Sequence, residues 1–258
     1  MVNEQIYYKE WGKRKIILDT INPRHFFGRF LLTRKLTKLR KEIKNVCDIG
    51  CGVGLLSNSL GKKGFKVHGY DMDKNAIKLA RLNKSKNTEF FVGNVYNLKN
   101  KSKYDAVIST SMLEHVKDDV KALKNMNKVM KPGGYLLLGV PYQMKYWTIQ
   151  DKMWGHYRRY EKKELEHKLK LAGFDVKKIR YIGYPTTKWF YFSFYLPAAK
   201  RKKKILEKKK LPFYYYALYL LRYLFLIDYF FNSEKKSTNI LFIAEKKLAN
   251  PVRKIDVG

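Results

Sequence analysis

Three glycines and one acid mark a loop that could hold a ligand. Asp48 stands two residues before Gly50, and Gly52 and Gly54 follow at alternate positions after an apolar run. Glycine lacks a Cβ and tolerates positive φ, so this turn lets the backbone approach a ligand closely. Dinucleotide-binding loops use G-x-G-x-x-G in the same strand, turn and helix context. The spacing G-x-G-x-G departs from that pattern and favours contact with an amino acid moiety over a pyrophosphate.

A second acid ends the next apolar run. Asp71 follows Gly54 by seventeen residues, and a carboxylate at this place can accept hydrogen bonds from both hydroxyls of a ribose. Asp73 competes for the role, but it precedes Lys74 and is better placed as the N-cap of the next helix. We therefore assign the ribose to Asp71. The alternative is that both acids only cap a helix.

Two histidines are candidates for a general base. His115 follows an apolar run at the edge where open α/β sheets bind ligands. His156 lies in the sequence GHYRRY, in which Arg158 and Tyr160 could recognise a substrate. The alternatives are that His115 starts a helix and that His156 is an ordinary loop residue. We predict no metal site from these residues.

Alternating elements must position these groups. Between residues 44 and 140, short apolar runs alternate with stretches of helical period, which is typical of βα units that build a parallel sheet. Pro132, Gly133 and Gly134 should stop one helix and turn the chain. The predicted strands are 45–49, 66–70, 89–92, 104–109, 135–140, 176–182 and 240–245, and the predicted helices are 55–61, 74–83, 116–130 and 161–172.

Four segments follow from this pattern. They are a helical cap at 1–43, a core at 44–184, an insertion at 185–237 and a last strand with a tail at 238–258. The insertion holds eight Lys and Arg residues between 200 and 210, next to an aromatic and aliphatic stretch at 212–231. Arg222, Asp228 and several tyrosines argue against a membrane-spanning helix there. We expect the insertion to lie on a membrane surface or to form a helical lid over a substrate pocket.

Charge and cysteine content limit the binding partners and the cellular compartment that we expect for the protein. The 55 Lys and Arg residues exceed the 22 Asp and Glu residues, so the net charge is +33. Nucleic acid and anionic membrane surfaces would both attract such a chain, and a general lysine bias would produce the same charge with no functional meaning. Cys47 and Cys51 suit neither a disulfide framework nor a four-ligand zinc site. With no apolar secretory segment at the N-terminus, we expect a cytoplasmic protein, with a peripheral place on the inner face of the membrane as a further hypothesis.

Several motifs together resemble those of the class I S-adenosylmethionine-dependent methyltransferases, over roughly residues 44–246. They are DIGCGVG at 48–54, GYD at 69–71, FVGNV at 91–95, YDAVISTSMLEHV at 104–116 and KPGGYLLLGVP at 131–141. The resemblance implies a doubly wound α/β fold with a seven-stranded, mostly parallel sheet whose last strand is antiparallel. It also implies S-adenosylmethionine as the cofactor.

Roles for single residues follow from the resemblance. Asp48 and the glycine loop would lie near the methionine end of the cofactor, and Asp71 would bind its ribose. Met72 and Val95 would contact the adenine, with Asn94 at its amino edge, where members of the class often have Asp. The cofactor-binding residues implied are Asp48, Gly50, Cys51, Gly52, Gly54, Asp71, Met72, Asn94, Val95, Ser109 and Leu113.

The expected chemistry needs mainly alignment, because a sulfonium already carries an activated methyl group. Holding a nucleophile in line with it can contribute on the order of 7 to 11 kcal/mol, more than one proton-transfer group usually supplies. A base such as His115 or His156 matters when the nucleophile is a hydroxyl. LEHV at 113–116, GHYRRY at 155–160 and AGF at 172–174 resemble a subgroup that includes ubiquinone-pathway O-methyltransferases.

We therefore expect O-methylation of a lipid-linked, quinone-like or other apolar small molecule. An RNA methyltransferase is the nearest alternative, because the positive charge would also hold phosphates. Against methylation of a nucleic-acid amine, residues 109–111 read Ser-Thr-Ser and lack the Pro-Pro-aromatic element of such enzymes. A third alternative is a cofactor-binding subunit without catalytic activity.

Overall fold

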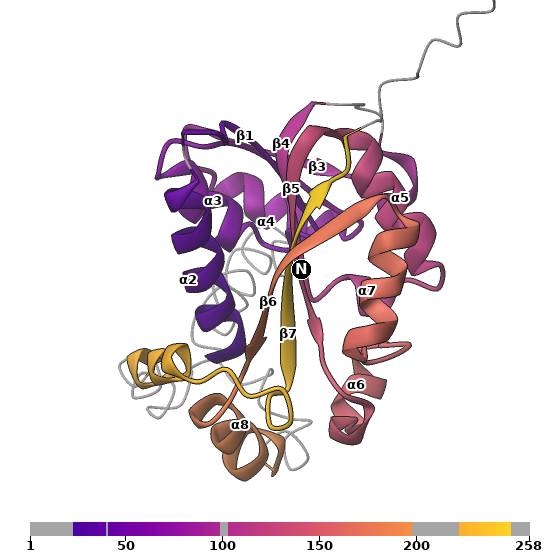
Figure 1. Cartoon of the computed structure of the whole chain (residues 1–258). Coiled ribbons are helices and arrows are strands. Elements are labelled where there is room, and N and C mark those ends of the chain that lie inside the picture. Colours follow the sequence, from indigo (N-terminus) through magenta and orange to yellow (C-terminus); the bar gives the residue numbers. More distant parts are fainter. Residues whose placement is uncertain (1–22, 40, 99–102, 198–221, 249–258) are drawn as a thin grey trace, which may run out of the picture.

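A seven-stranded sheet forms the centre of the protein (Figure 1). The computed structural model describes residues 23–39, 41–98, 103–197 and 222–248. The strand order is β3-β2-β1-β4-β5-β7-β6, and β7 pairs antiparallel with both of its neighbours. The sequence prediction of an α/β sheet with an antiparallel last strand is confirmed. The strands are β1 (Asn45–Ile49), β2 (Lys66–Asp71), β3 (Thr88–Val92), β4 (Tyr104–Thr110), β5 (Met130–Pro141), β6 (Phe174–Ile182) and β7 (Asn239–Lys246).

Helices cover both faces of the sheet (Figure 1). Helices α2 and α3 pack with one face, and α5 and α7 pack with the other. The described helices are α2 (Pro23–Lys38), α3 (Leu55–Gly61), α4 (Lys74–Leu82), α5 (Asp119–Val129), α6 (Ile149–Met153), α7 (Lys162–Leu171) and α8 (Thr186–Phe190). Shorter helical segments are η1 (Val95–Asn97), η2 (Leu113–His115), η3 (Met144–Tyr146), the π-helix η4 (Tyr191–Tyr195) and the 3-10 helix η5 (Arg222–Phe230).

Successive residues of the central strands enter two different cores. In β4, Val107 packs in the hydrophobic core between the sheet and helices α5 and α7. Ala106 and Ile108 pack in the hydrophobic core on the other face, with α2 and α3. Strand side chains alternate between faces, and a sheet covered on both sides therefore needs apolar residues at nearly every position. The continuous apolar runs of the sequence reflect this double burial.

The element boundaries differ most from the sequence prediction between residues 116 and 135, and β6 begins two residues earlier than predicted, at Phe174. The predicted helix 116–130 begins at Asp119, because Asp118 caps it by accepting the Lys121 N–H at 2.9 Å. Strand β5 begins directly after this helix, at Met130, which pairs with Tyr104 before the register shifts. The residues Pro132 to Gly134, predicted as a turn, are therefore part of the β5 strand.

The described ends of the insertion, 185–197 and 222–237, adjoin the carboxyl edge of the sheet. Pro141 of β5 and Ile182 of β6 both pair with Asn239, so β5 and β6 end at the same edge and β7 begins there. Helix α8 follows β6, and η5 precedes β7. The predicted basic run at 200–210 and residues 1–22 of the predicted cap lie outside the described residues. Among the helices that the structure describes, none is long and apolar enough to cross a membrane.

Candidate functional site

The glycine loop between β1 and α3 leaves its backbone open to a ligand. Gly50, Gly52 and Gly54 all have positive φ, at 78°, 53° and 78°. A Cβ on Gly52 would meet no atom within 4 Å, whereas a Cβ on Gly50 would lie 2.7 Å from the Cβ of Met112. The loop therefore packs against the segment that leads into η2 on one side and is open at Gly52. This is the close backbone approach that the sequence predicted.

Asp71 connects this loop to the end of β2. Its Oδ2 accepts the N–H of Gly52 at 2.8 Å, and its Oδ1 accepts the N–H of Asp73 at 2.9 Å. A carboxylate has about four acceptor positions on its two oxygens, so each oxygen can take one more hydrogen bond from a ribose hydroxyl. Asp73 caps α4 by accepting the N–H groups of Asn75 and Ala76, as predicted.

Asp48 lies beneath the loop. It is 2% exposed, and its Oδ2 accepts the hydroxyl of Ser57 at 2.6 Å. Burial raises the pKa of Asp48 to about 6, against the opposing hydrogen bond from Ser57. Cys51 is half-buried beside it, and burial raises the pKa of that thiol. Asp48 therefore acts by shaping the loop from below, because little of its side chain faces solvent.

The predicted adenine contacts differ in how much surface they offer. Met72 is 65% exposed directly after Asp71, whereas Val95 is 5% exposed and belongs to the main core. The side-chain oxygen of Asn94 already accepts the N–H of Tyr96 at 2.9 Å, which leaves one lone pair for an amino group. The adenine contact proposed for Val95 is thus restricted to its backbone and a small part of its side chain.

Two other predicted cofactor contacts are buried. Ser109 and Leu113 are both 0% exposed, so their side chains present no surface to a ligand. Between them, Ser111 is exposed and has a positive φ of 51°, and Met112 packs on Gly50. Sequence reasoning missed Ser111 and Met112. A non-glycine residue with positive φ is uncommon and often marks a functional turn, but the sequence carries no signal for it.

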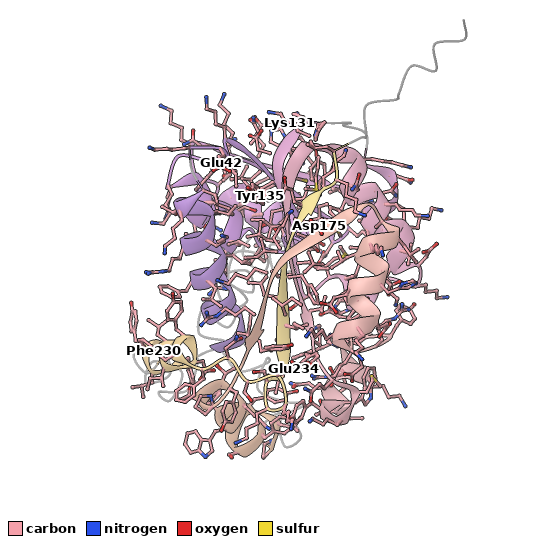
Figure 2. All side chains as sticks on the ribbon, in the orientation of Figure 1. Glu42, Lys131, Tyr135, Asp175, Phe230 and Glu234 are labelled. Atoms are coloured by element: carbon pink, nitrogen blue, oxygen red, sulfur yellow. The ribbon has the colours of Figure 1, made fainter. Side chains whose placement is uncertain are left out.

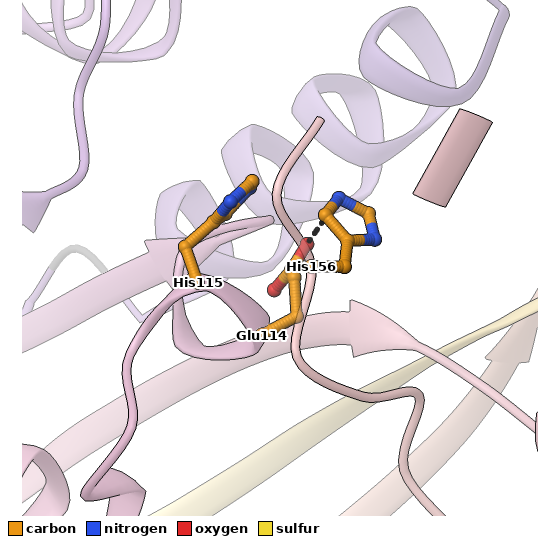
Figure 3. Close-up of side chains that lie close together, drawn as sticks. All are labelled: Glu114, His115 and His156. Carbon is orange, nitrogen blue, oxygen red and sulfur yellow. Dashed lines mark ion pairs between the residues drawn. The ribbon is translucent and has the colours of Figure 1, made fainter. Parts of the chain in front are cut away.

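The structure brings the two predicted histidines together. The rings of His115 and His156 have centroids 4.6 Å apart and are nearly perpendicular, at 88° (Figure 3). His115 ends η2, three residues after Met112, so the pair lies beside the glycine loop. Partial burial and the neighbouring His156 lower the pKa of His115, while the backbone of Trp154 and Gly155 acts in the opposite direction. A neutral imidazole, as a base requires, is favoured at His115.

A buried carboxylate orients His156. Asp151 Oδ1 lies 3.0 Å from His156 Nδ1, and the side chains of both are at least 95% buried, at 1% and 5% exposed. Arg159 Nη2 lies 2.8 Å from the same oxygen of Asp151. Burial alone would raise the pKa of Asp151, but the bonds from His156 and Arg159 hold it well below its usual range. Asp151 thereby favours the proton on Nδ1 and leaves Nε2 of His156 facing Glu114, 4.0 Å away.

Arg158 and Tyr160, predicted to bind substrate, have another role in the structure. Arg158 Nη1 donates to Asp119 at 2.6 Å and Nη2 donates to the Lys117 carbonyl at 2.9 Å. Tyr160 is 0% exposed, and its hydroxyl bonds Asp119 at 3.0 Å and the Leu113 carbonyl at 3.1 Å. Burial and Asp119 raise the pKa of Tyr160. These two residues therefore attach the segment that carries His156 to α5 and η2.

Glu114 completes a group that the sequence prediction did not include. Glu114, His115 and His156 each offer one ligand atom, and these atoms lie within 4.8 Å of one another (Figure 3). One carboxylate and two imidazoles form a donor set that divalent transition metals accept. The Asp151 contact to the far nitrogen of His156 is also the usual support of a metal-bound histidine. The three groups can therefore share either a proton or a divalent cation.

The known sequences that this chain resembles are those of methyltransferases. A family model described as "Methyltransferase domain" matches residues 24–179, more than half of the chain. A ubiquinone biosynthesis O-methyltransferase of Pelagibacter ubique is 33% identical over 142 residues, which cover 50% of this chain and 59% of that protein. The mitochondrial ubiquinone biosynthesis O-methyltransferase of Dictyostelium discoideum is 39% identical over 109 residues, covering 36% of this chain and 34% of that protein. The chain thus matches between about a third and three fifths of the length of these relatives.

Solved structures share the fold at low sequence identity. Phosphoethanolamine N-methyltransferase 2 of Haemonchus contortus, in complex with S-adenosyl-L-methionine, superposes with a TM-score of 0.58 at 20% identity, over 84% of this chain and 52% of that chain. Magnesium protoporphyrin IX methyltransferase of Synechocystis, with bound S-adenosylhomocysteine, has a TM-score of 0.56 at 16% identity, and the match covers 85% of this chain and 81% of that chain. The [4+2]-cyclase SpnF has a TM-score of 0.60 at 17% identity, and the match covers 83% of this chain and 81% of that chain. Proteins with this fold therefore also catalyse other reactions.

The family match indicates S-adenosylmethionine as the cofactor, and the open loop at Gly52 with the acceptor oxygens of Asp71 fits it. The chain belongs to the methyltransferase-domain family.

Proposed function

We propose that this protein transfers a methyl group from S-adenosylmethionine to a hydroxyl of an apolar small molecule, of a lipid-linked or quinone-like kind. The observation that carries the proposal is the packing of η2 against the glycine loop, which joins a cofactor site to the pair His115 and His156. Two elements from distant parts of the sequence thus supply a cofactor loop and a base at one edge of the sheet.

The protein residues have three tasks in this reaction. When bound, the cofactor would supply an activated methyl group on its sulfonium, and the glycine loop and Asp71 would hold the cofactor. Holding the acceptor oxygen in line with that methyl group contributes on the order of 7 to 11 kcal/mol. The histidine pair accepts the hydroxyl proton: the imidazole of His115 is exposed and its pKa is lowered, and Asp151 holds Nδ1 of the adjoining His156 at 3.0 Å. Removal of that proton contributes a further factor of roughly 10² to 10⁴ in rate.

Oxygen is favoured as the nucleophile for two reasons. The relatives with the higher identity are named O-methyltransferases, and a positioned base gives a hydroxyl its largest advantage. Apolar groups flank His156 in the chain: Met153, Trp154 and Tyr157 are 70%, 40% and 52% exposed, and the ring of Trp154 lies 5.8 Å from that of His156. Exposed thioether and aromatic groups beside a base favour an apolar acceptor.

Transfer of labelled methyl from S-adenosylmethionine into an extract of the source cells tests the proposal. The products are separated into lipid, small-molecule, RNA and protein fractions. We expect label in the lipid or apolar small-molecule fraction, and we expect it to disappear with Asp71→Ala. Label in RNA would replace the proposal with an RNA methyltransferase. Absence of label in every fraction, with cofactor bound, would favour a non-catalytic subunit.

A further inference from the structure

Helix η5 turns a row of apolar side chains to solvent. A 3-10 helix has three residues per turn, so residues three apart lie in one row. The buried row holds Phe225 and Asp228, which are 5% and 1% exposed. The row Leu224, Ile227 and Phe230 is 53%, 42% and 82% exposed. Three apolar side chains of this helix thus face solvent while its acid Asp228 is buried, against the usual pattern of charged residues outward.

The contacts of Asp228 fix this orientation. Its carboxylate accepts the N–H and the hydroxyl of Thr186 at 2.8 and 2.6 Å, and the N–H of Thr187 at 3.1 Å. These are the first residues of α8, whose Phe190 also meets Phe225 at a ring distance of 5.4 Å. Rotating the exposed row inward would break three hydrogen bonds to a buried carboxylate, which is costly. The outward row is therefore held by the fold.

The residue directly after η5 adds a further exposed ring beside this row. Phe231 is 44% exposed, and together Leu224, Ile227, Phe230 and Phe231 are here called the apolar face. Figure 2 shows Phe230 on η5 at the outer margin of the molecule. Aliphatic and aromatic side chains are both present, and scattered single exposures would not produce such a row.

The apolar face belongs to the same end of the molecule as the histidine pair. Helix α8 follows the carboxyl end of β6, and the adjoining η4 contacts α6 through Tyr191, whose hydroxyl donates to Gln150 at 2.7 Å. Asp151 of α6 in turn holds His156. A partner bound to the apolar face would therefore lie at the end of the molecule that carries the histidine pair.

The basic side chains near the apolar face indicate which kind of partner would bind there. Lys188 of α8 and Lys236 after η5 lie at the same end, where they contact Tyr146 and Tyr184. The chain as a whole has a net charge of +33. An apolar row beside basic side chains matches the two layers of an anionic lipid surface, acyl chains and headgroups. RNA would use the rings for stacking but would have no use for Leu224 and Ile227.

We propose that the apolar face docks the protein on the surface of an anionic lipid bilayer. Leu224, Ile227 and Phe230 enter the boundary between headgroups and acyl chains, and the lysines contact the headgroups. The docking goes beyond the proposed methyl transfer and rests on it only for the nature of the acceptor, which would be reached from the same bilayer.

Vesicle sedimentation with the full chain tests the docking without cofactor or acceptor, so its outcome is independent of methyl transfer. Vesicles of phosphatidylglycerol with phosphatidylcholine are compared with vesicles of phosphatidylcholine alone. The variant is Ile227→Glu with Phe230→Glu, and the matched control is Leu82→Glu, whose side chain is 67% exposed at the far end of α4. We expect binding to anionic vesicles, a loss of at least about tenfold in the double variant, and a change below about twofold in the control.

Three results would overturn the docking. Wild-type protein that stays in the supernatant with anionic vesicles would exclude a lipid surface, and equal binding by the double variant would exclude the apolar face. Binding to total RNA that is lost in the same variant, without vesicle binding, would assign the face to nucleic acid. Circular dichroism of both variants shows whether they remain folded, which the exposure of the substituted side chains leads us to expect.

Discussion

Asp71 is the residue on which the cofactor site depends. Its two oxygens join Gly52 to the start of α4 and still have acceptor positions for a ribose. We expect Asp71→Asn to weaken binding of S-adenosylhomocysteine roughly 10- to 100-fold, since hydrogen bonds to a charged group contribute about 1.5 to 3 kcal/mol. Isothermal titration measures this directly.

Asp73→Asn is the matched control for that measurement. Asp73 caps α4, and asparagine caps a helix about as well as aspartate, so affinity should stay within about twofold. An equal loss in both variants would mean that Asp71 acts only through the backbone of this turn and does not bind the ribose.

Asp48 gives the apo protein a specific pH dependence. Its pKa is about 6 in the folded protein, against 3.8 for an unperturbed group. Between these values the folded state holds a proton that the unfolded state has lost, so the contribution of Asp48 to stability falls as pH rises from about 4 to 6 and is constant above that. At pH 7, Asp48→Asn should raise the free energy of unfolding by up to ~3 kcal/mol. Urea unfolding at pH 4 and pH 7 measures the difference, and a variant that is less stable than wild type at pH 7 would contradict this account.

At the residue scale, sequence motifs predicted where the site lies but not which side chains reach its surface. Gly50, Gly52 and Gly54 have the positive φ angles that their spacing suggested. Ser109 and Leu113, which the family resemblance implied through the stretch 104–116, are buried. Motifs record residue type and order, whereas exposure depends on the packing of β4 and η2 against distant parts of the chain.

At the scale of elements, hydrogen bonds from Tyr160 and Arg158 to Asp119 attach the segment 154–160 to α5. We expect Tyr160→Phe to lower the free energy of unfolding by about 1 to 2 kcal/mol, because it removes the one hydroxyl proton that the Asp119 carboxylate and the Leu113 carbonyl share in a buried place. The KM for the acceptor should change little, since the side chain has no exposed surface. Thermal unfolding and steady-state kinetics of the same variant separate these effects. A KM that rises tenfold with unchanged stability would restore the substrate role that the sequence suggested.

The elements themselves were largely predictable. Strand β1 and helix α3 have the predicted boundaries, because an apolar run and a glycine turn define them locally. The start of α5 was missed by three residues, since Asp118 and Asp119 compete as caps and tertiary contacts of Asp119 decide between them. The approach of His156 to His115 was not predictable from sequence, because it depends on Asp151, Arg159 and Tyr160 acting together.

At the scale of the whole molecule, the net charge of +33 has a thermodynamic consequence. Like charges repel in the compact state, and salt screens this repulsion within a Debye length of about 10 Å at 0.1 M. We expect the Tm to rise when sodium chloride increases from about 20 to 300 mM, an approximate range chosen to span that screening length. Differential scanning calorimetry measures this shift. A Tm that falls with salt would mean that the ion pairs of the folded protein outweigh the general repulsion.

The sequence predicted the overall architecture because a doubly wound sheet has a strong pattern of apolar runs and glycine turns. It did not reveal that η5 turns its apolar row outward. That arrangement depends on Asp228, which was noted in the sequence only as a charge unsuited to a membrane span and which caps α8 in the structure.

The most direct test of the account pairs two measurements on His156→Gln: affinity for S-adenosylhomocysteine and the rate of methyl transfer to the acceptor fraction. His167→Gln is the control, because His167 is exposed on α7. We predict unchanged affinity with a rate lowered roughly 10²- to 10⁴-fold, and an unaffected control. An unchanged rate would contradict the role of His156 in the pair that accepts the proton. Loss of wild-type activity on chelation, restored by a divalent cation, would instead assign Glu114, His115 and His156 to a metal.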